Sequence, residues 1–238
     1  MHRCYAPHAA RPSIVLSDDE AHHVTRVLRL GVGAEVAVFD GRGGEWLGRI
    51  ADSTRSLTRV ELVEARVPVV EPAVSVTVAI SLLKADGMNN VIRDVTMLGA
   101  AAIVPLVSAH VAGPDPGRRT QTVERWARVA VASSKQCGRA VVPDIRPLAT
   151  LEAVLAAETG TRVCCVEPSL STGASVGVGP RPTSALVCVG PEGGWSDEEL
   201  ACAHRYEARL LALGPRTLRA EAAPTVALSV LWTCWGWS

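Results

Sequence analysis

Short apolar segments alternate with helical patterns from residue 74 to the end of the chain. Residues 74–80 alternate apolar and small side chains as a strand does, and Val91, Val95 and Leu98 then recur at helical spacing before Gly99, a natural helix stop. Further strands are predicted at residues 100–107, 162–166, 185–189 and 208–213, and helices at 122–137 and 225–235. Strands that alternate with helices predict an α/β domain with a mostly parallel sheet.

The first 70 residues have a different hydrophobic pattern. Apolar runs at residues 36–39, 46–50 and 57–63 are short and are broken by Gly and Asp, which predicts a small β-rich module. Pro68 and Pro72 bracket a stretch without helical pattern, so a linker is expected there. We therefore predict two domains, at residues 1–70 and 71–238.

Composition narrows the class of protein. The chain has 238 residues, of which 48% are hydrophobic and 20% charged, as in a folded globular protein. Lys plus Arg equals Asp plus Glu at 24 each, so any RNA contact must come from a local basic patch. The seven cysteines show no Cys-x-x-Cys spacing, and their odd number argues against a disulfide framework. We expect a cytoplasmic protein without a metal site and, since no segment approaches about 20 apolar residues, without a membrane span.

Two loops that follow predicted strands are candidate ligand-binding loops. The strand at 185–189 runs into Gly-Pro-Glu-Gly-Gly at residues 190–194, and Ser196 with Glu199 has the spacing of a capping box that starts a helix. The strand at 208–213 runs into Gly-Pro-Arg at residues 214–216. Glycines let a ligand approach backbone amides and carbonyls closely, and ligands of parallel sheets bind at the carboxyl ends of strands. The alternative for the first loop is a tight strand-to-helix turn.

These loops resemble those of a known family. Gly-Pro-Glu-Gly-Gly at 190–194, followed by Leu-Gly-Pro-Arg-Thr-Leu-Arg at 213–219, is similar to the SPOUT superfamily of methyltransferases, and within it to the 16S rRNA uridine-N3 methyltransferase family. The likeness extends over nearly the whole chain, including residues 23–33, 39–41, 84–106 and 126–143.

The resemblance implies a fold, a cofactor and partners. It implies an N-terminal PUA-like β-barrel for RNA, a C-terminal α/β domain with a deep trefoil knot, a homodimer, and S-adenosylmethionine as methyl donor. By the same resemblance, the cofactor site comprises Glu167, Pro168, Gly190, Pro191, Glu192, Gly193, Leu213, Gly214, Thr217 and Leu218.

Uracil N3 carries an imide proton that must leave before the nitrogen attacks a methyl group well. A base, or a cation that stabilises the deprotonated ring, therefore assists the reaction. Arg216, Arg219 and Glu221 are the candidates near the second loop, Arg219 to orient the substrate and Glu221 for a polar contact. For both arginines, the alternative is a phosphate contact or a salt bridge at a dimer interface.

Basic residues in two places are candidates for RNA contact. Arg26 and Arg29 are three residues apart in a helix-like segment, a spacing that puts both on one face. Phosphate contact is one interpretation and a solvated helix face is the other. A second cluster leads into and out of the predicted helix at 122–137 and ends at Arg139. Lys84, which opens a segment of family likeness, is also predicted on the substrate side.

The chain departs from the family pattern where a substrate could touch it. Met97 occupies a position that is usually acidic, and the stretch around His110 lacks an arginine that the family carries. Ala220 and Ala222 replace two hydroxyl residues. We therefore place Met97 and His110 among the substrate-side candidates and keep a second hypothesis, in which the acceptor is a nitrogen of a small heterocyclic metabolite. A third is a non-catalytic RNA-binding module, against which the intact cofactor loops argue.

Overall fold

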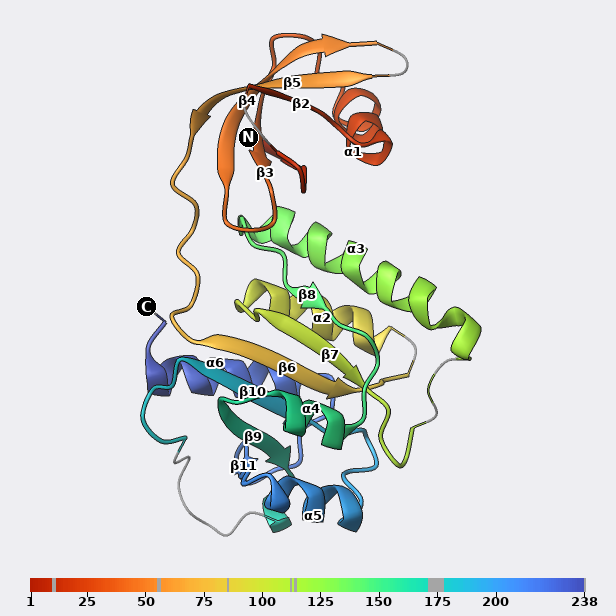
Figure 1. Ribbon diagram of the computed structural model, residues 1–238, viewed down its shortest axis with the longest axis vertical. Helices are drawn as coiled ribbons and strands as arrows, with labels where there is room; N and C mark the ends of the chain where they lie inside the picture. The colour runs from red at the N-terminus through yellow and green to blue at the C-terminus, as the bar shows by residue number, and fades with distance from the viewer. Residues whose placement is uncertain are drawn as a thin grey trace. The chain divides into compact units, whose positions relative to one another are not determined.

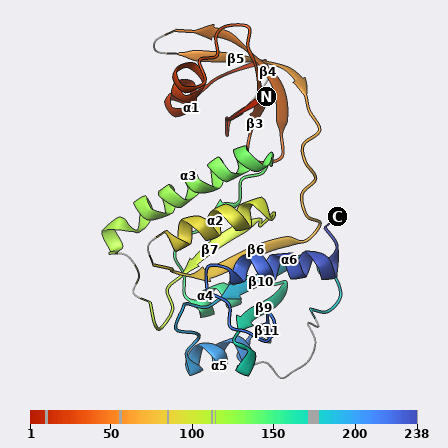
Figure 2. The same ribbon diagram turned by 180° about the vertical axis from the view of Figure 1, so that it is seen from behind.

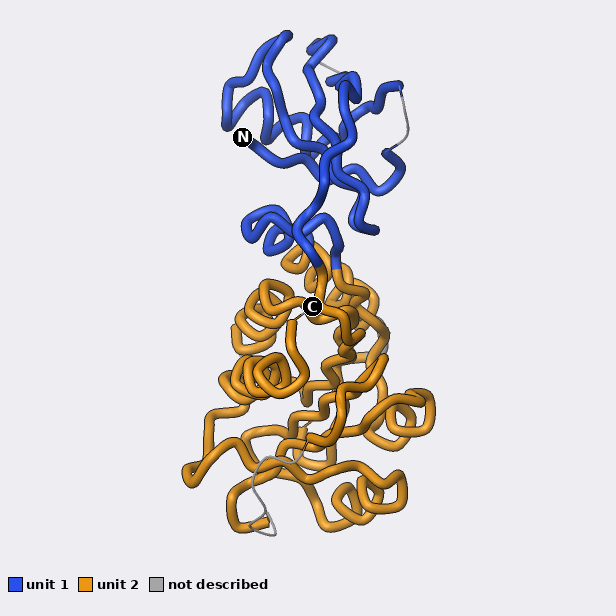
Figure 3. The backbone as a smooth tube through the Cα atoms, turned by 90° about the vertical axis from the view of Figure 1, so that its left-hand side faces the viewer, with its two compact units in different colours: residues 1–70, 131–142 blue, residues 71–130, 143–238 orange. Residues whose placement is uncertain are grey.

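The computed structural model describes residues 1–9, 12–54, 57–84, 86–111, 113, 115–170 and 178–237. The chain forms two compact units, drawn in different colours in Figure 3: unit 1 comprises residues 1–70 and 131–142, and unit 2 comprises residues 71–130 and 143–238. Nothing in the hydrophobic pattern indicated that residues 131–142 group with the N-terminal part of the chain.

Unit 1 is built on a five-stranded sheet in the order β1-β3-β4-β5-β2. Its elements are β1 (His2–Tyr5), β2 (Ser13–Val15), α1 (Asp18–His22), the π-helical η1 (His23–Val27), β3 (Glu35–Phe39), β4 (Glu45–Ser53) and β5 (Thr58–Ala65). The strand β1 runs parallel to β3, and the other neighbouring pairs are antiparallel. Alternate apolar side chains such as Val38, Ile50 and Val60 point inward and form the core of this unit.

A hydrogen bond from Arg3 and a salt bridge of Lys135 hold residues 131–142 within unit 1. Arg3 donates to the Glu45 carboxylate at 2.7 Å and to the backbone carbonyl of Arg139 at 2.8 Å, and its guanidinium lies 4.8 Å from the centroid of the Phe39 ring. The Lys135 ammonium lies 2.8 Å from the carboxylate of Glu20 on α1. Because these side chains are largely buried, both contacts are screened little by solvent.

The helical segment near Arg26 ends earlier than the spacing predicted. The π-helical stretch η1 stops at Val27, and Arg29 has a φ of 55° in the left-handed region. The chain turns there toward Gly31 and Gly33, where Gly33 has a φ of 90° and leads into β3. The prediction that Arg26 and Arg29 share one helical face is therefore wrong.

Unit 2 is an α/β unit whose six-stranded sheet is parallel throughout, in the order β11-β9-β10-β6-β7-β8. Its first elements are β6 (Ser75–Ser81), α2 (Gly87–Met97), β7 (Ala102–Leu106), the 3-10 turn η2 (Pro116–Arg118), α3 (Arg119–Cys137, which continues into unit 1) and β8 (Asp144–Ile145). The remainder are α4 (Leu151–Ala157), β9 (Thr161–Val166), the 3-10 turn η3 (Pro168–Leu170), β10 (Ser184–Val189), α5 (Asp197–Arg205), β11 (Arg209–Ala212) and α6 (Ala223–Trp235). The predicted α/β class with a parallel sheet is confirmed, whereas the knot stays a prediction.

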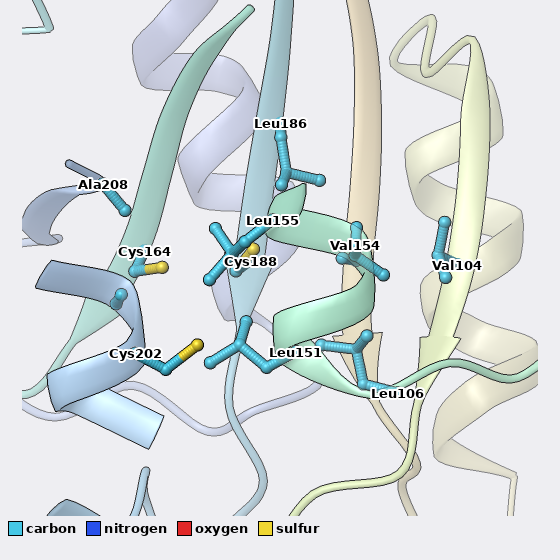
Figure 4. Packing of buried hydrophobic residues seen from close by; sticks show 12 residues of the cluster. Val104, Leu106, Leu151, Val154, Leu155, Cys164, Leu186, Cys188, Cys202 and Ala208 are labelled. Atoms are coloured by element: carbon cyan, nitrogen blue, oxygen red, sulfur yellow. The ribbon is translucent and has the colours of Figure 1, made fainter. Parts of the chain in front are cut away.

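Helices cover both faces of this sheet. The helices α4 and α5 pack on one face, and α2 and α6 pack against each other on the opposite face (Figures 1 and 2). Figure 4 shows the first of these layers, in which Leu151 and Leu155 of α4 lie over Leu186 and Cys188 of β10. Because both faces are buried, the strands are continuous apolar runs, as the sequence of β10 is. No helix among the described residues has the length and apolar character needed to cross a membrane.

Candidate functional site

A cavity of about 620 Å³ lies in unit 2, where the carboxyl ends of β6, β9, β10 and β11 meet. In parallel sheets this edge is where ligands bind, because the loops that leave neighbouring strands converge there. The lining comes from the four strand-end segments: residues 83, 84 and 87 after β6, residues 165–168 and 170 at the end of β9, residues 189–195 at the end of β10, and residues 213, 216–221 and 223 after β11.

The loop after β10 is a tight turn that opens the helix α5. The Gly194 amide donates to the Pro191 carbonyl at 3.0 Å, and Gly194 has a φ of 75°, which favours glycine. Ser196 and Glu199 form the predicted capping box: the Glu199 amide donates to the Ser196 hydroxyl at 3.2 Å, and the Ser196 amide donates to the Glu199 carboxylate at 2.9 Å. The prediction of a helix start at this point is confirmed.

Trp195 closes the base of this loop. Its indole Nε1 donates to the Cys165 carbonyl at 2.9 Å, and Cys165 is the last residue of β9 that pairs with β10, opposite Val189. The indole also lies against Gly190, because a Cβ built there would be 3.0–3.2 Å from three indole atoms. A side chain at position 190 would therefore have to displace this ring by a few tenths of an ångström.

The loop after β11 brings charge to the cavity. Gly214 has a φ of 116°, and the chain then turns into α6, with the amides of Ala222 and Ala223 bonded to the Arg219 carbonyl. An Arg219 Nη lies 3.9 Å from a Glu221 carboxylate oxygen, and the two side chains are 88% and 46% exposed. Such an exposed pair contributes little to stability, so both groups stay available to a ligand.

The amino end of α2 forms another wall. Lys84 and Gly87 line the cavity, and a Cβ on Gly87 would lie 3.8 Å from a carboxylate oxygen of Glu221. The segments that follow β6 and β11, more than 100 residues apart in the chain, are therefore side by side at this point.

The segment after β7 is attached to the outside of the Gly-rich loop. The Ala109 amide donates to Glu199 at 3.1 Å, and a Cβ on Gly193 would lie 3.7 Å from the Cβ of His110. The pKa of the exposed Glu198 carboxyl is lowered by hydrogen bonds from its own backbone amide and then from the Ser196 hydroxyl, with a smaller effect from His110. His110 is thus next to the loop, although it is not among the lining residues.

Most of the predicted site residues come together here. The lining includes the predicted residues Lys84, Glu167, Pro168, Gly190, Pro191, Glu192, Gly193, Leu213, Arg216, Thr217, Leu218, Arg219 and Glu221. Gly214 is adjacent to the lining and Met97 is at the opposite end of α2 from Gly87. Arg26, Arg29 and Arg139 belong to unit 1, where Arg139 is buried.

Several lining residues were not predicted from the sequence: Leu83, Gly87, Leu170, Val189, Trp195 and Ala223. A glycine before a helical pattern was the one signal for Gly87. Nothing in the sequence indicated that the Trp195 indole bonds to the Cys165 carbonyl, because that contact depends on how β9 and β10 are paired.

Known proteins resemble this chain over most of its length. A family profile described as an RNA methyltransferase domain matches residues 70–232, and one described as an RNA methyltransferase PUA domain matches residues 16–62. The ribosomal RNA small subunit methyltransferase E of Synechocystis sp. is 33% identical over 91% of this chain and 72% of its own. The protein of that name from Bacillus subtilis is 28% identical over 92% and 90% of the two chains.

A solved structure agrees with these relatives. A putative methyltransferase from Legionella pneumophila, determined in complex with the bound cofactor SAM, superimposes with a TM-score of 0.89 over 98% of this chain and 97% of its own, at 27% identity. The fold and both profile matches agree, and the chain belongs to the RNA methyltransferase family that includes the ribosomal RNA small subunit methyltransferases E.

Proposed function

We propose that this chain is an S-adenosylmethionine-dependent methyltransferase of small-subunit ribosomal RNA, and that its acceptor is N3 of a uridine. The observation that carries the proposal is the cavity at the carboxyl ends of β6, β9, β10 and β11, in a chain whose relatives are named for this rRNA activity. The Legionella pneumophila neighbour holds SAM, which supports the choice of cofactor.

The lining residues suit S-adenosylmethionine. The volume of about 620 Å³ is within the usual range for small-molecule sites, about 300–1,000 Å³. Gly190, Gly193 and Gly194 contribute only backbone atoms to the lining, which a ligand can approach closely. Apolar walls such as Leu213 and Leu218 suit an adenine ring, and the Glu167 carboxylate suits ribose hydroxyls or a cation. When bound, the cofactor supplies an electrophilic methyl group.

The chain's own residues would then orient the acceptor and assist the loss of its proton. The positive charge of Arg219 stabilises a deprotonated uracil ring, and Arg216 is available for a second contact or a phosphate. Glu221, next to Arg219 and to the amino end of α2, makes a polar contact with the base. Most of the rate enhancement comes from positioning, because the reaction needs the nitrogen in line with the transferred methyl group.

A second acceptor class is favoured by one observation. Ala220 lies in the lining with 9% of its surface exposed, at a position where the resemblance implies a hydroxyl. A wall made less polar in this way would suit a small heterocyclic metabolite. We rank this below ribosomal RNA, because the relatives and the PUA profile both refer to RNA.

The remaining expectations stay proposals. We propose that residues 1–70 bind RNA, with Arg26 and Arg29 among the candidates, and that residues 71–238 carry the methyltransferase domain with a trefoil knot. Arg139, outside residues 1–70, is a further candidate for RNA contact. Met97 and His110 remain substrate-side candidates. A homodimer and a cytoplasmic location remain predictions from the resemblance and the composition.

The acceptor is tested with S-adenosylmethionine that carries a labelled methyl group. Small ribosomal subunits from cells that lack the modification, and a small-metabolite extract, are incubated separately with the enzyme. Label in 16S rRNA, recovered as 3-methyluridine, is the expected result. Label in another rRNA nucleoside would refute the N3 assignment alone, and label only in the metabolite fraction would refute the RNA assignment.

A further inference from the structure

Trp195 lines the cavity and also contacts two other segments of its wall. Its Nε1–H is bonded to the Cys165 carbonyl at 2.9 Å, and its ring lies against Gly190. The bond reaches β9 from the far end of the loop that leaves β10.

These contacts close the Gly-rich loop at its base. The ladder between β9 and β10 ends at the pair Cys165 and Val189, and the five residues 190–194 then leave the sheet. The indole N–H bonds to the same Cys165 that ends the ladder, so both ends of the loop are tied to one residue of β9. Two cavity walls, residues 165–168 and residues 190–194, are thereby held at a fixed separation.

We infer that Trp195 is a positioning residue for S-adenosylmethionine, which holds the loop at 190–194 and the end of β9 in the arrangement that binds the cofactor. This inference rests on the proposed function and adds a residue role to it. A loop already held in its binding conformation loses less conformational freedom when the ligand binds, so the affinity is higher. The ring itself acts through the two loops and takes no part in methyl transfer.

The alternative is that Trp195 only packs the fold. Unit 2 contains a matched control for that role, because the Trp232 indole N–H also donates to a backbone carbonyl, that of Leu98, at 2.8 Å. Trp232, on α6, is buried against the end of α2 and is not a lining residue of the cavity. Replacement by Phe removes one indole-to-carbonyl hydrogen bond at either position.

The test compares Trp195→Phe and Trp232→Phe with the wild type, using S-adenosylmethionine calorimetry, thermal unfolding and the KM for rRNA. Both variants should lose thermal stability. Only Trp195→Phe should raise the dissociation constant for the cofactor, by about fivefold, as expected for one hydrogen bond that is lost from the binding-competent state. The KM for rRNA should stay within twofold, a split that a general loss of folding would not produce.

Equal cofactor affinities in Trp195→Phe and wild type would overturn the inference and leave the proposed function intact. A wild type that binds no cofactor would overturn both. If Trp195→Phe fails to fold, hydrogen exchange of the indole N–H in the wild type tests whether Trp195 is bonded to Cys165. A Trp195 N–H that is protected in the cofactor-free protein supports the tie to Cys165, and exchange at the rate of a solvated indole refutes it.

Discussion

The carboxylate of Glu199 accepts the backbone N–H of Ala109 at 3.1 Å through one oxygen, and through the other it accepts the Ser196 amide at 2.9 Å. One side chain thus caps the helix α5 and holds the segment after β7 against the outside of the Gly-rich loop. The loop is fixed on one side by this carboxylate and on the other by the Trp195 indole.

Loss of the Ser196 cap should weaken cofactor binding as well as the fold. Ser196→Ala removes the N-cap of α5 and should lower the free energy of unfolding by about 1 kcal/mol. Thr150→Ala is the matched control, because Thr150 caps α4 in the same way, through a 3.2 Å bond from the Ala153 amide. Urea denaturation should give similar losses for both, and calorimetry should show weaker S-adenosylmethionine binding for Ser196→Ala alone. Equal affinities in the two variants would show that the cap does not support the loop.

Adjacent glycines should respond differently to alanine. Gly194 has a φ of 75°, so Gly194→Ala should cost about 1 kcal/mol of stability. At Gly193 the backbone is not in the left-handed region, and the nearest atom to an added Cβ is 3.7 Å away, an ordinary contact. Gly193→Ala should therefore be neutral or slightly stabilising. Urea denaturation of both variants checks this, and an equal loss at both positions would contradict the observed loop conformation.

Arg219→Ala should impair methyl transfer without impairing cofactor binding. Removal of a charge that stabilises the deprotonated base should lower kcat by about tenfold to a hundredfold. The side chain is 88% exposed, so stability should change little. Arg93→Ala is the control, since Arg93 is an exposed arginine of α2 outside the cavity lining. Unchanged kcat in Arg219→Ala, measured with labelled methyl donor on small subunits, would remove Arg219 from the mechanism.

The cysteines should differ widely in reactivity. Burial, with a smaller effect of neighbouring Cys164, raises the pKa of Cys165 to about 12, so its buried thiol is protonated at pH 8. Cys234 is exposed. Iodoacetamide at pH 8, followed by peptide mass spectrometry, should label Cys234 in minutes and Cys165 only after unfolding. Rapid labelling of Cys165 in the folded protein would contradict its place at the end of β9.

The raised pKa values of buried cysteine thiols make the free energy of unfolding depend on pH. Burial, together with the charge of Glu20, also raises the pKa of Cys4 to about 12. A thiol in the unfolded chain has a pKa of about 8.5. Above that pH the unfolded chain releases protons that the Cys4 and Cys165 thiols keep in the folded state. Their contribution is fully present below about pH 8.5 and is lost as the pH rises toward about 12. Urea midpoints at pH 7 and pH 10 should show this fall, and Cys4→Ala with Cys165→Ala should reduce it.

Local signals predicted much of unit 2. Apolar runs located β6, β7, β9, β10 and β11, because strands buried on both faces are apolar at nearly every position. The helix stop at Gly99 is confirmed by its φ of 85°, and the capping box at Ser196 by both of its hydrogen bonds. In each case the structure depends on residues a few positions apart.

Features that depend on distant residues were not predictable from these signals. The strand β8 has two residues and no apolar period, and it exists because Asp144 and Ile145 pair with β7. The grouping of residues 131–142 with unit 1 depends on contacts such as that of Lys135 with Glu20, 115 positions apart. The bond from Trp195 to Cys165 likewise follows from strand order.

The cavity at the carboxyl ends of β6, β9, β10 and β11 is the proposed binding site of the methyl donor. A crystal structure of the chain with S-adenosylmethionine tests it most directly. We expect cofactor density in contact with Gly190, Leu213 and Leu218, with the methyl group directed toward the side of Arg219 and Glu221. Density at another place in the chain, or an empty cavity at saturating cofactor, would contradict it.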